Sequence, residues 1–379
     1  MKKVITFCIL SLLFLTSCLS TKSIQLEPIE IDIVKSHNGN FEYMVDPRVE
    51  LMTIICRLTG YNVFNNNYNG DNAYLTQVDS FFSKYKDETV IKSAQGFMER
   101  GVWGDAFISL AYHIKPDFSG TIISMKPIPE TLNDQWKKIG SSSINTFVKQ
   151  VHDFAIKSNF VRFYAVNRSD YLSNIVWLDD GFEKKNVGSW ANGFFTGIDI
   201  GETTVVSSRV LAGFNLYDFA GDADGKKLSY VASYPGAYYA DMTCAYFALY
   251  LQDYITQNWD SVKDNYTKFL KAFLKKINPD KDPKEFDKRE VRQQDLRGDL
   301  SMYIYIAYLE DNIPTAKEDD DYFKPHYDAF YAHLEKTVGD DFLRAMELMK
   351  EYKGNRDKYP EFKDFYPLIN DYVNSLPTE

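Results

Sequence analysis

The histidines are the first residues whose spacing could build a metal site. The chain has five, His37, His113, His152, His326 and His333. A peptidase-type zinc site needs two imidazoles one helical turn apart and a glutamate that activates water, the HExxH pattern. No pair has that spacing, so the sequence predicts no metal site and no cofactor. We expect hydrogen-bonded, structural roles for His113 and His152.

Carboxylates could support a second chemistry, because a pair of them can hydrolyse a glycosidic bond. The candidates lie beside aromatic or glycine-rich sequence: Asp105, Asp179, Asp180, Glu202 and Asp241. With 53 acids in the chain, spacing selects no pair. The five tryptophans could stack on sugars but are more simply core residues. Neither a G-x-S-x-G elbow nor a P-loop is present, so no catalytic residue is predicted.

Cys18 carries the clearest chemical signal. Lys2 and Lys3 precede the apolar run Val4–Leu15, which has signal-peptide length and is too short to span a bilayer as an ordinary helix. The run ends in Leu15-Thr16-Ser17-Cys18, which resembles the lipobox of bacterial lipoproteins. Its thiol would accept diacylglycerol and become the first residue of the mature chain. The alternative is an ordinary secretory signal with an incidental cysteine.

These motifs predict a signal peptide over residues 1–17, a tether over 18–26 and a single large domain over 27–379, with residue 233 as the place for a sub-boundary. Several acyl chains would anchor the protein permanently to a membrane. We therefore expect the cell envelope as its location, outside the cytoplasm, facing either the periplasm or the cell surface.

The charge and the cysteine content of the chain bear on two further questions, whether it binds nucleic acid and whether it contains disulfides. Without residues 1–17 the chain has 41 basic and 53 acidic residues, a net charge of −12, which argues against nucleic acid as a partner. Cys56 and Cys244 are the thiols left after lipidation and cleavage. Because both lie in apolar stretches, we expect free buried thiols rather than a disulfide.

Periodicity predicts an α+β fold with a β-rich middle segment, about 160–232, and a predominantly helical C-terminal half. Ile29–Ile33 alternates like an edge strand or hairpin, and Asp222–Gly225 is typical of a hairpin turn. A helix capped by Asp46 should end at Gly60. The other predicted helices cover 74–86, 89–99, 141–158, 238–256, 259–276, 284–309, 326–337, 340–352 and 361–374.

Four segments are similar to a family of uncharacterised bacterial lipoproteins and secreted proteins, with coverage from about 40 to 375. They are Tyr43–Gly60 around Asp46-Pro47-Arg48-Val49-Glu50-Leu51, Phe82–Lys86, Gly104–Leu110 and Tyr352–Pro360. Many members carry an HExxH helix and a downstream glutamate, so the resemblance implies a metallopeptidase-like scaffold. Chain order would place that helix at 238–256 and that glutamate near Gln293.

This sequence departs from the family there, because 238–256 has neither histidine and Gln293 is an amide. The resemblance then implies a pseudoenzyme, an envelope lipoprotein that binds a peptide, protein or glycan. The alternative is a hydrolase, peptidase or glycosidase, with a non-standard site. The family comparison places a pocket where the two helices meet, near Asp241, Thr243, Cys244, Gln293 and Arg297.

Overall fold

The structure is a computed structural model. It describes residues 26–39, 41–61, 64, 72–129, 132, 134–182, 185–211, 216–221, 227–233, 239–313 and 323–378. For residues 72, 216–221, 227–233 and 239–241 only the backbone is described. Cys18 and the predicted turn Asp222–Gly225 lie outside these ranges.

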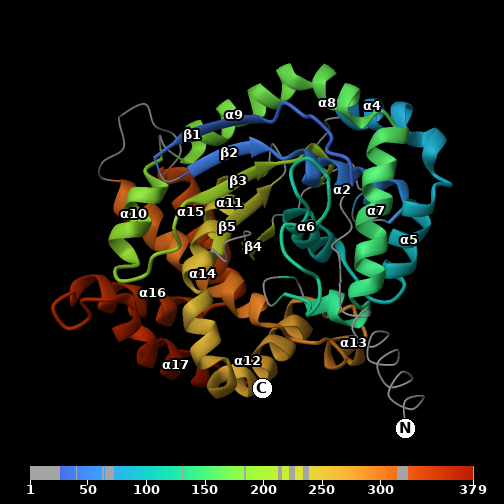
Figure 1. The fold of residues 1–379 in the computed structure, drawn as a ribbon. Helices are drawn as coiled ribbons and strands as arrows, with labels where there is room; N and C mark the ends of the chain where they lie inside the picture. Colours follow the sequence, from blue (N-terminus) through green and yellow to red (C-terminus); the bar gives the residue numbers. More distant parts are fainter. Residues whose placement is uncertain are drawn as a thin grey trace, which may run out of the picture.

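A five-stranded mixed sheet lies at the centre of the molecule (Figure 1). Its strands are β1 Val34–Asn38, β2 Phe41–Val45, β3 Thr203–Ser207, β4 Leu216–Gly221 and β5 Lys227–Ser233. Their spatial order is β1-β2-β3-β5-β4. The hairpins β1–β2 and β4–β5 are antiparallel, whereas β2–β3 and β3–β5 are parallel. Parallel neighbours need long crossovers: the chain between β2 and β3 contains α2 to α10, whereas the chain between β3 and β5 passes through β4.

Helices form most of the rest of the described chain. They are α2 Pro47–Leu58, α4 Asn72–Phe82, α5 Thr89–Met98, α6 Gly104–His113, α7 Ser141–Lys157, α8 Phe160–Val166, α9 Arg168–Phe182, α10 Val187–Phe194, α11 Tyr239–Tyr250, α12 Gln252–Ile277, α13 Pro283–Asp287, α14 Gln293–Asn312, α15 Phe323–Thr337, α16 Asp340–Gly354 and α17 Tyr366–Asn374. In the view of Figure 1, α4, α5 and α7 lie to the right of the sheet, α9 runs above it, and α12, α16 and α17 lie below it.

Aromatic packing joins the sheet to its helices. The Phe41 ring of β2 contacts Phe182 of α9 and Tyr246 of α11, with centroids 5.0 and 5.1 Å apart. Helix α10 approaches the same ring at Gly188, where a Cβ atom would lie 2.8 Å from it. Helix α9 contacts β1, β2 and β3, and α11 contacts β4 and β5. The α11 contacts connect the C-terminal helices to the sheet.

The α+β class is confirmed, and helix dominates it. Helix α2 matches its prediction closely, with Asp46 as N-cap and Gly60 at φ +79° just after its end. Each predicted helix over 74–86, 89–99, 141–158, 326–337, 340–352 and 361–374 has an observed counterpart. A metallopeptidase-like scaffold is not supported by the structure.

The β-rich interpretation of the middle segment is wrong up to residue 194, because α8, α9 and α10 occupy it. In α9 the buried positions Tyr171, Ile175, Leu178 and Phe182 follow helical spacing. Only the part from Thr203 onward forms strands within the described segment. Ile29–Ile33 is not a strand either, and the hairpin begins at Val34.

Helix boundaries in the C-terminal half also differ from the prediction. The break expected near residue 257 lies at Leu251, where a helix buried almost all round gives way to one with a single buried stripe. The predicted helix 284–309 is divided into α13 and α14, each with its own N-terminal cap. These capped starts were not recognised in the sequence.

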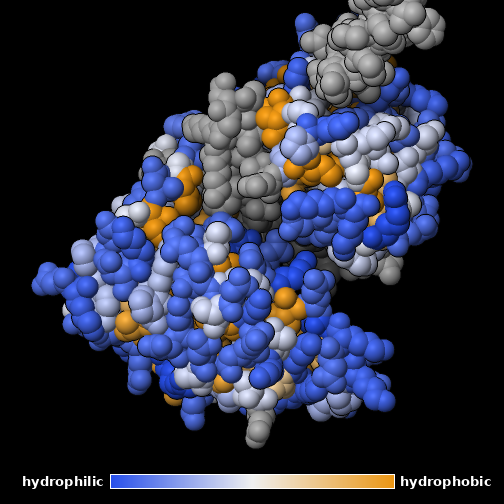
Figure 2. Space-filling model, turned by 60° about the horizontal axis from the view of Figure 1, so that its bottom comes forward, coloured by the Kyte–Doolittle hydropathy of each residue, from blue (hydrophilic) through white to orange (hydrophobic). Residues whose placement is uncertain are grey.

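The outer surface on the face of Figure 2 is mostly hydrophilic, with hydrophobic residues in scattered patches. Exposed large hydrophobic side chains among the described residues are Trp103, Ile156, Val166, Leu172, Val176 and Ile277. No helix in the described ranges is long and apolar enough to cross a membrane. Cys56 and Cys244 are not disulfide-bonded, as predicted, but only Cys56 is buried, whereas Cys244 is partly exposed.

Candidate functional site

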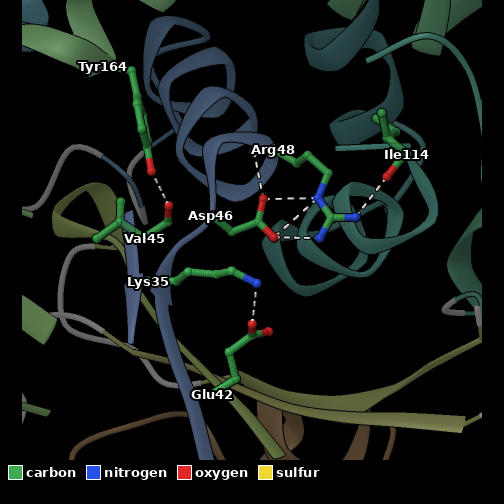
Figure 3. Close-up of polar contacts among 7 residues, drawn as sticks. All are labelled: Lys35, Glu42, Val45, Asp46, Arg48, Ile114 and Tyr164. Atoms are coloured by element: carbon green, nitrogen blue, oxygen red, sulfur yellow. Dashed lines mark hydrogen bonds and ion pairs between the residues drawn. The ribbon is translucent and has the colours of Figure 1, made fainter. Parts of the chain in front are cut away.

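Two buried acids stand close together where β2 passes into α2. Asp46 caps the helix by accepting the backbone N–H of Arg48 at 2.8 Å, and its carboxylate also pairs with the Arg48 guanidinium at 2.5 Å. That guanidinium donates to the Ile114 carbonyl at 2.8 Å (Figure 3). The Tyr164 hydroxyl donates to the Val45 carbonyl in the same view. These bonds give Asp46, Arg48 and the Val45 carbonyl hydrogen-bond partners, and they hold the end of β2 against the start of α2.

Glu50, one turn further along α2, is only 1% exposed. The Tyr74 hydroxyl donates to its carboxylate, and the Tyr74 and Tyr171 hydroxyls lie 2.7 Å apart. Burial raises the pKa of Glu50, against the opposing effects of the Tyr74 and Ser208 hydroxyls and the charge of Arg209. We call Glu50, Tyr74, Tyr171 and Ser208 the Glu50 cluster. It joins α2, α4, α9 and the end of β3.

A cavity of about 590 Å³ lies among α11, α12, α14 and α15. We call it the α14 cavity. Its apolar wall consists of Ala245, Leu270, Phe273, Leu274, Met302 and Phe330, and its polar groups include Tyr266, Arg289, Gln294, Asp295 and Asp299. Its volume is within the range of small-molecule sites, which combine an apolar wall with a few placed polar groups.

Asp299 is the chemically distinctive group of the α14 cavity. The Tyr266 hydroxyl of α12 donates to its Oδ2 at 2.7 Å, and no other described group hydrogen-bonds to this carboxylate. Burial raises the pKa of Asp299 to about 6, with a further contribution from the charge of Asp295. Burial and the neighbouring Asp299 also raise the pKa of Tyr266, which keeps its hydroxyl a proton donor.

The other charges of the α14 cavity neutralise each other. Asp295 accepts a hydrogen bond from the Arg289 guanidinium at 2.9 Å and another from the Arg292 backbone N–H at 2.7 Å. This arrangement caps the N-terminus of α14. The cavity therefore presents one net negative charge, on Asp299, in an apolar setting.

Two further cavities offer less chemistry. In a cavity of about 460 Å³ beside Trp190, Lys353 and the Trp190 indole both bind Asp311, and the indole stacks on Phe194 at 4.7 Å. Another, of about 630 Å³ beside α4 and α8, is lined by Lys84 and Arg162 but by no acid. Glu50 lines none of the three cavities.

The residues predicted to form a pocket are only partly brought together. Helices α11 and α14 do contact each other, and Cys244 lines the α14 cavity. Thr243 and Arg297 are each 3% exposed, and the Arg297 guanidinium donates to the Gln252 side chain rather than lining the cavity. Gln293 is exposed, and its neighbour Gln294 lines the cavity instead. Asp241 belongs to α11, but its side chain lies outside the described residues.

The glycosidase candidates occupy separate structural roles. Asp105 near the start of α6 accepts from Gln135 at 3.2 Å, and Asp179 of α9 accepts from Asn38 at 2.9 Å. Glu202 pairs with His37 at 2.8 Å on the surface. Asp180 lies next to Asp179 on α9, partly buried. No pair of these carboxylates lines any of the three cavities.

The structural interpretation of two histidines is confirmed. The buried His113 ring bonds to the Ser109 carbonyl at 2.8 Å, and burial lowers its pKa, so the ring is held neutral. The His152 ring bonds to the Glu27 carbonyl at 2.8 Å. Within the described ranges, no three His, Cys, Asp or Glu side chains are grouped so that they could hold a metal ion.

Sequence reasoning missed Tyr266, Asp299 and Phe330. One signal for Asp299 was present, since it is an acid within the largely apolar stretch Leu296–Leu309 of α14. Its pairing with Tyr266 joins residues 33 positions apart on different helices, which no local pattern reports.

Comparison with known proteins identifies no relative: no family model, curated protein or solved structure matches this chain.

Proposed function

We propose that this chain is a lipid-anchored protein of the bacterial cell envelope that binds a small ligand in the α14 cavity without catalysing a reaction. The anchor is supported by the Lys2-Lys3 start, the apolar run Val4–Leu15 and the lipobox-like Leu15–Cys18. The binding role is supported by the cavity of about 590 Å³ with its apolar wall and single uncompensated carboxylate.

The cavity carries the functional part of the proposal. The cavity is open to solvent, and several of its apolar side chains, among them Phe273, Met302 and Phe330, are only partly buried. Partial burial also opposes the ionisation of Asp299. A ligand that covers the apolar side chains and pairs with the carboxylate would be favoured on both counts.

The anchor is tested by metabolic labelling with a palmitate analogue and membrane fractionation. The wild-type chain should be labelled and sediment with membranes. A Cys18→Ser chain should lose the label, because serine cannot form the thioether. Label retained in the Cys18→Ser chain would overturn the lipoprotein assignment.

The cavity is tested with N-phenyl-1-naphthylamine, a fluorescent apolar probe that is uncharged at neutral pH. The chain from Leu19 onward contains every described element and needs no detergent. Its addition should raise probe fluorescence saturably. Gly298→Leu should suppress the rise, since Gly298 lines the cavity and a Cβ atom there meets nothing within 4 Å.

Gly96→Leu is the matched control, because Gly96 is also a helical glycine with open space at Cβ but lies on α5, away from the cavity. Equal binding by wild type, Gly298→Leu and Gly96→Leu, or no binding by wild type, would overturn the cavity as the site. Elemental analysis gives a second test, since one zinc per purified chain would contradict a non-catalytic binding role.

A further inference from the structure

The α14 cavity is apolar except on one side, and this asymmetry restricts what can bind there. Its wall offers the aliphatic side chains of Leu270, Leu274 and Met302 and the rings of Phe273 and Phe330. On the polar side, Asp295 is already engaged by Arg289 and by the backbone of Arg292. Asp299 accepts one hydrogen bond, at Oδ2, and among the described residues Oδ1 has none.

The groups that face Asp299 come from several elements. Tyr266 faces it from α12, Asp295 and Tyr303 from α14 itself, Arg289 from the segment between α13 and α14, and Tyr372 from α17. The three tyrosines are neutral because burial raises their pKa values. Since Arg289 pairs directly with Asp295, no described cation pairs directly with Asp299.

We infer that the α14 cavity binds small organic amines, with the apolar body against the α12 and α15 side chains and the protonated nitrogen at the Asp299 carboxylate. This inference rests on the proposed function and names the ligand class of the same cavity. It follows from charge complementarity, since a partly buried carboxylate with an open oxygen is paired best by a charged donor.

Other ligand classes fit less well. An anion would be repelled at short range by the Asp299 carboxylate, which no described cation pairs with directly. An alcohol can donate to Oδ1 but leaves the charge unpaired. A metal ion would need further ligands, and the nearest acid, Asp295, has both oxygens occupied.

If the amine pairs with Asp299, its affinity should depend on pH. An alkylamine stays protonated up to about pH 10, as a lysine side chain does. Asp299 has a pKa of about 6 in the empty cavity, so it is ionised above that pH and protonated below it. Amine affinity should therefore be constant above pH 7 and should fall about tenfold for each pH unit below 6.

The experiment is calorimetric titration of the chain from Leu19 onward with three molecules that share a phenyl body: 2-phenylethylamine, 2-phenylethanol and 3-phenylpropanoate. At pH 7.5 the amine should bind at least tenfold more tightly than the alcohol, and the acid should bind most weakly. At pH 5 the amine affinity should be about tenfold lower, while the alcohol affinity should be unchanged.

Asp299→Asn keeps the size of the side chain and its hydrogen bond from Tyr266 but removes the charge, so it should abolish the preference for the amine over the alcohol. Asp264→Asn is the matched control, because it removes a charge from an exposed position on α12 that does not line the cavity. It should leave the preference intact.

An amine that binds no better than the alcohol, or a preference that survives Asp299→Asn, would overturn the inference. If N-phenyl-1-naphthylamine and the alcohol bind and Gly298→Leu blocks both, that outcome leaves the proposed binding function standing. If none of these probes binds, the proposed function fails together with the inference.

Discussion

Glu50 and Asp299 are both acids set in apolar stretches of helix, and burial raises the pKa of each. Their surroundings differ. Glu50 is 1% exposed and is enclosed by the Tyr74 and Tyr171 hydroxyls and by Ser208. Asp299 accepts one hydrogen bond from Tyr266 and opens into a cavity of about 590 Å³. A raised pKa alone therefore does not distinguish a structural acid from one that could bind a ligand.

The two acids differ in whether the carboxylate lines one of the three cavities: that of Asp299 does and that of Glu50 does not. The Glu50 cluster uses its carboxylate as a hydrogen-bond acceptor that joins α2 to α4 and, through Tyr171, to α9. Glu50 Oε2 has no hydrogen-bond partner, but it is fully buried. Asp299 joins α12 to α14, and its carboxylate lines the α14 cavity, where its second oxygen can accept from another donor. Substitutions at the two acids should consequently have opposite effects on stability, and only the substitution at Asp299 should change amine binding.

The largest effect is expected for Glu50→Ala. This change leaves the buried Tyr74 hydroxyl without its acceptor and opens a void, which should lower the free energy of unfolding by about 3 kcal/mol. Urea denaturation measures the loss, and amine binding by the folded fraction should be unchanged. Glu50→Gln, which preserves the volume and an acceptor, should retain most of the stability. A loss below about 1 kcal/mol for Glu50→Ala would show that the cluster is not a structural junction.

Asp299→Asn should instead stabilise the protein, in a pH-dependent way. The pKa of Asp299 rises from 3.8 to about 6 on folding, a shift of about two units that corresponds to about 3 kcal/mol. Below pH 4 the carboxyl is protonated in both the folded and the unfolded chain, so the substitution should have little effect there.

Between pH 4 and 6 the unfolded chain releases this proton while the folded chain retains it, so wild-type stability falls as the pH rises and then levels off. The excess stability of Asp299→Asn should grow over the same interval and reach up to about 3 kcal/mol above pH 6. Thermal unfolding of both chains at pH 4 and pH 7 measures this difference. Equal effects at the two pH values would refute the assigned burial of Asp299.

The smallest effect concerns the empty space itself. Gly298→Ala should raise the free energy of unfolding by about 1 kcal/mol, because alanine favours helix and open space surrounds the new Cβ. Gly96→Ala on α5 should give a similar gain. Chemical denaturation of the pair tests this expectation. Destabilisation at Gly298 alone would mean that the cavity wall is already in contact there.

Local patterns predicted much of the helical framework but not the site. The Asp46-Pro47 start and Gly60 end of α2 are encoded within a few residues, so this helix could be predicted. The parallel pairing of β2 with β3 joins Phe41 to Thr203 and has no local signature. The β-rich prediction for 160–232 included α9, although its buried residues Tyr171, Ile175 and Leu178 have helical spacing.

The same limit applies to the acids. In the sequence the two acids look alike, because each lies beside apolar residues in a helical segment: Val49-Glu50-Leu51 and Gly298-Asp299-Leu300. The partners that enclose Glu50 come from positions 74, 171 and 208, whereas those of Asp299 leave one side open. Only the three-dimensional packing separates the two cases.

The central claim, that Asp299 is open to a cationic ligand and Glu50 is closed, is tested most directly by carboxyl NMR titration of both residues in one sample. Without ligand, Asp299 should titrate near pH 6. Saturating 2-phenylethylamine should lower the pKa of Asp299 by at least one unit and leave that of Glu50 unchanged. An unchanged Asp299 pKa, or a shift at Glu50 in its place, would contradict the account.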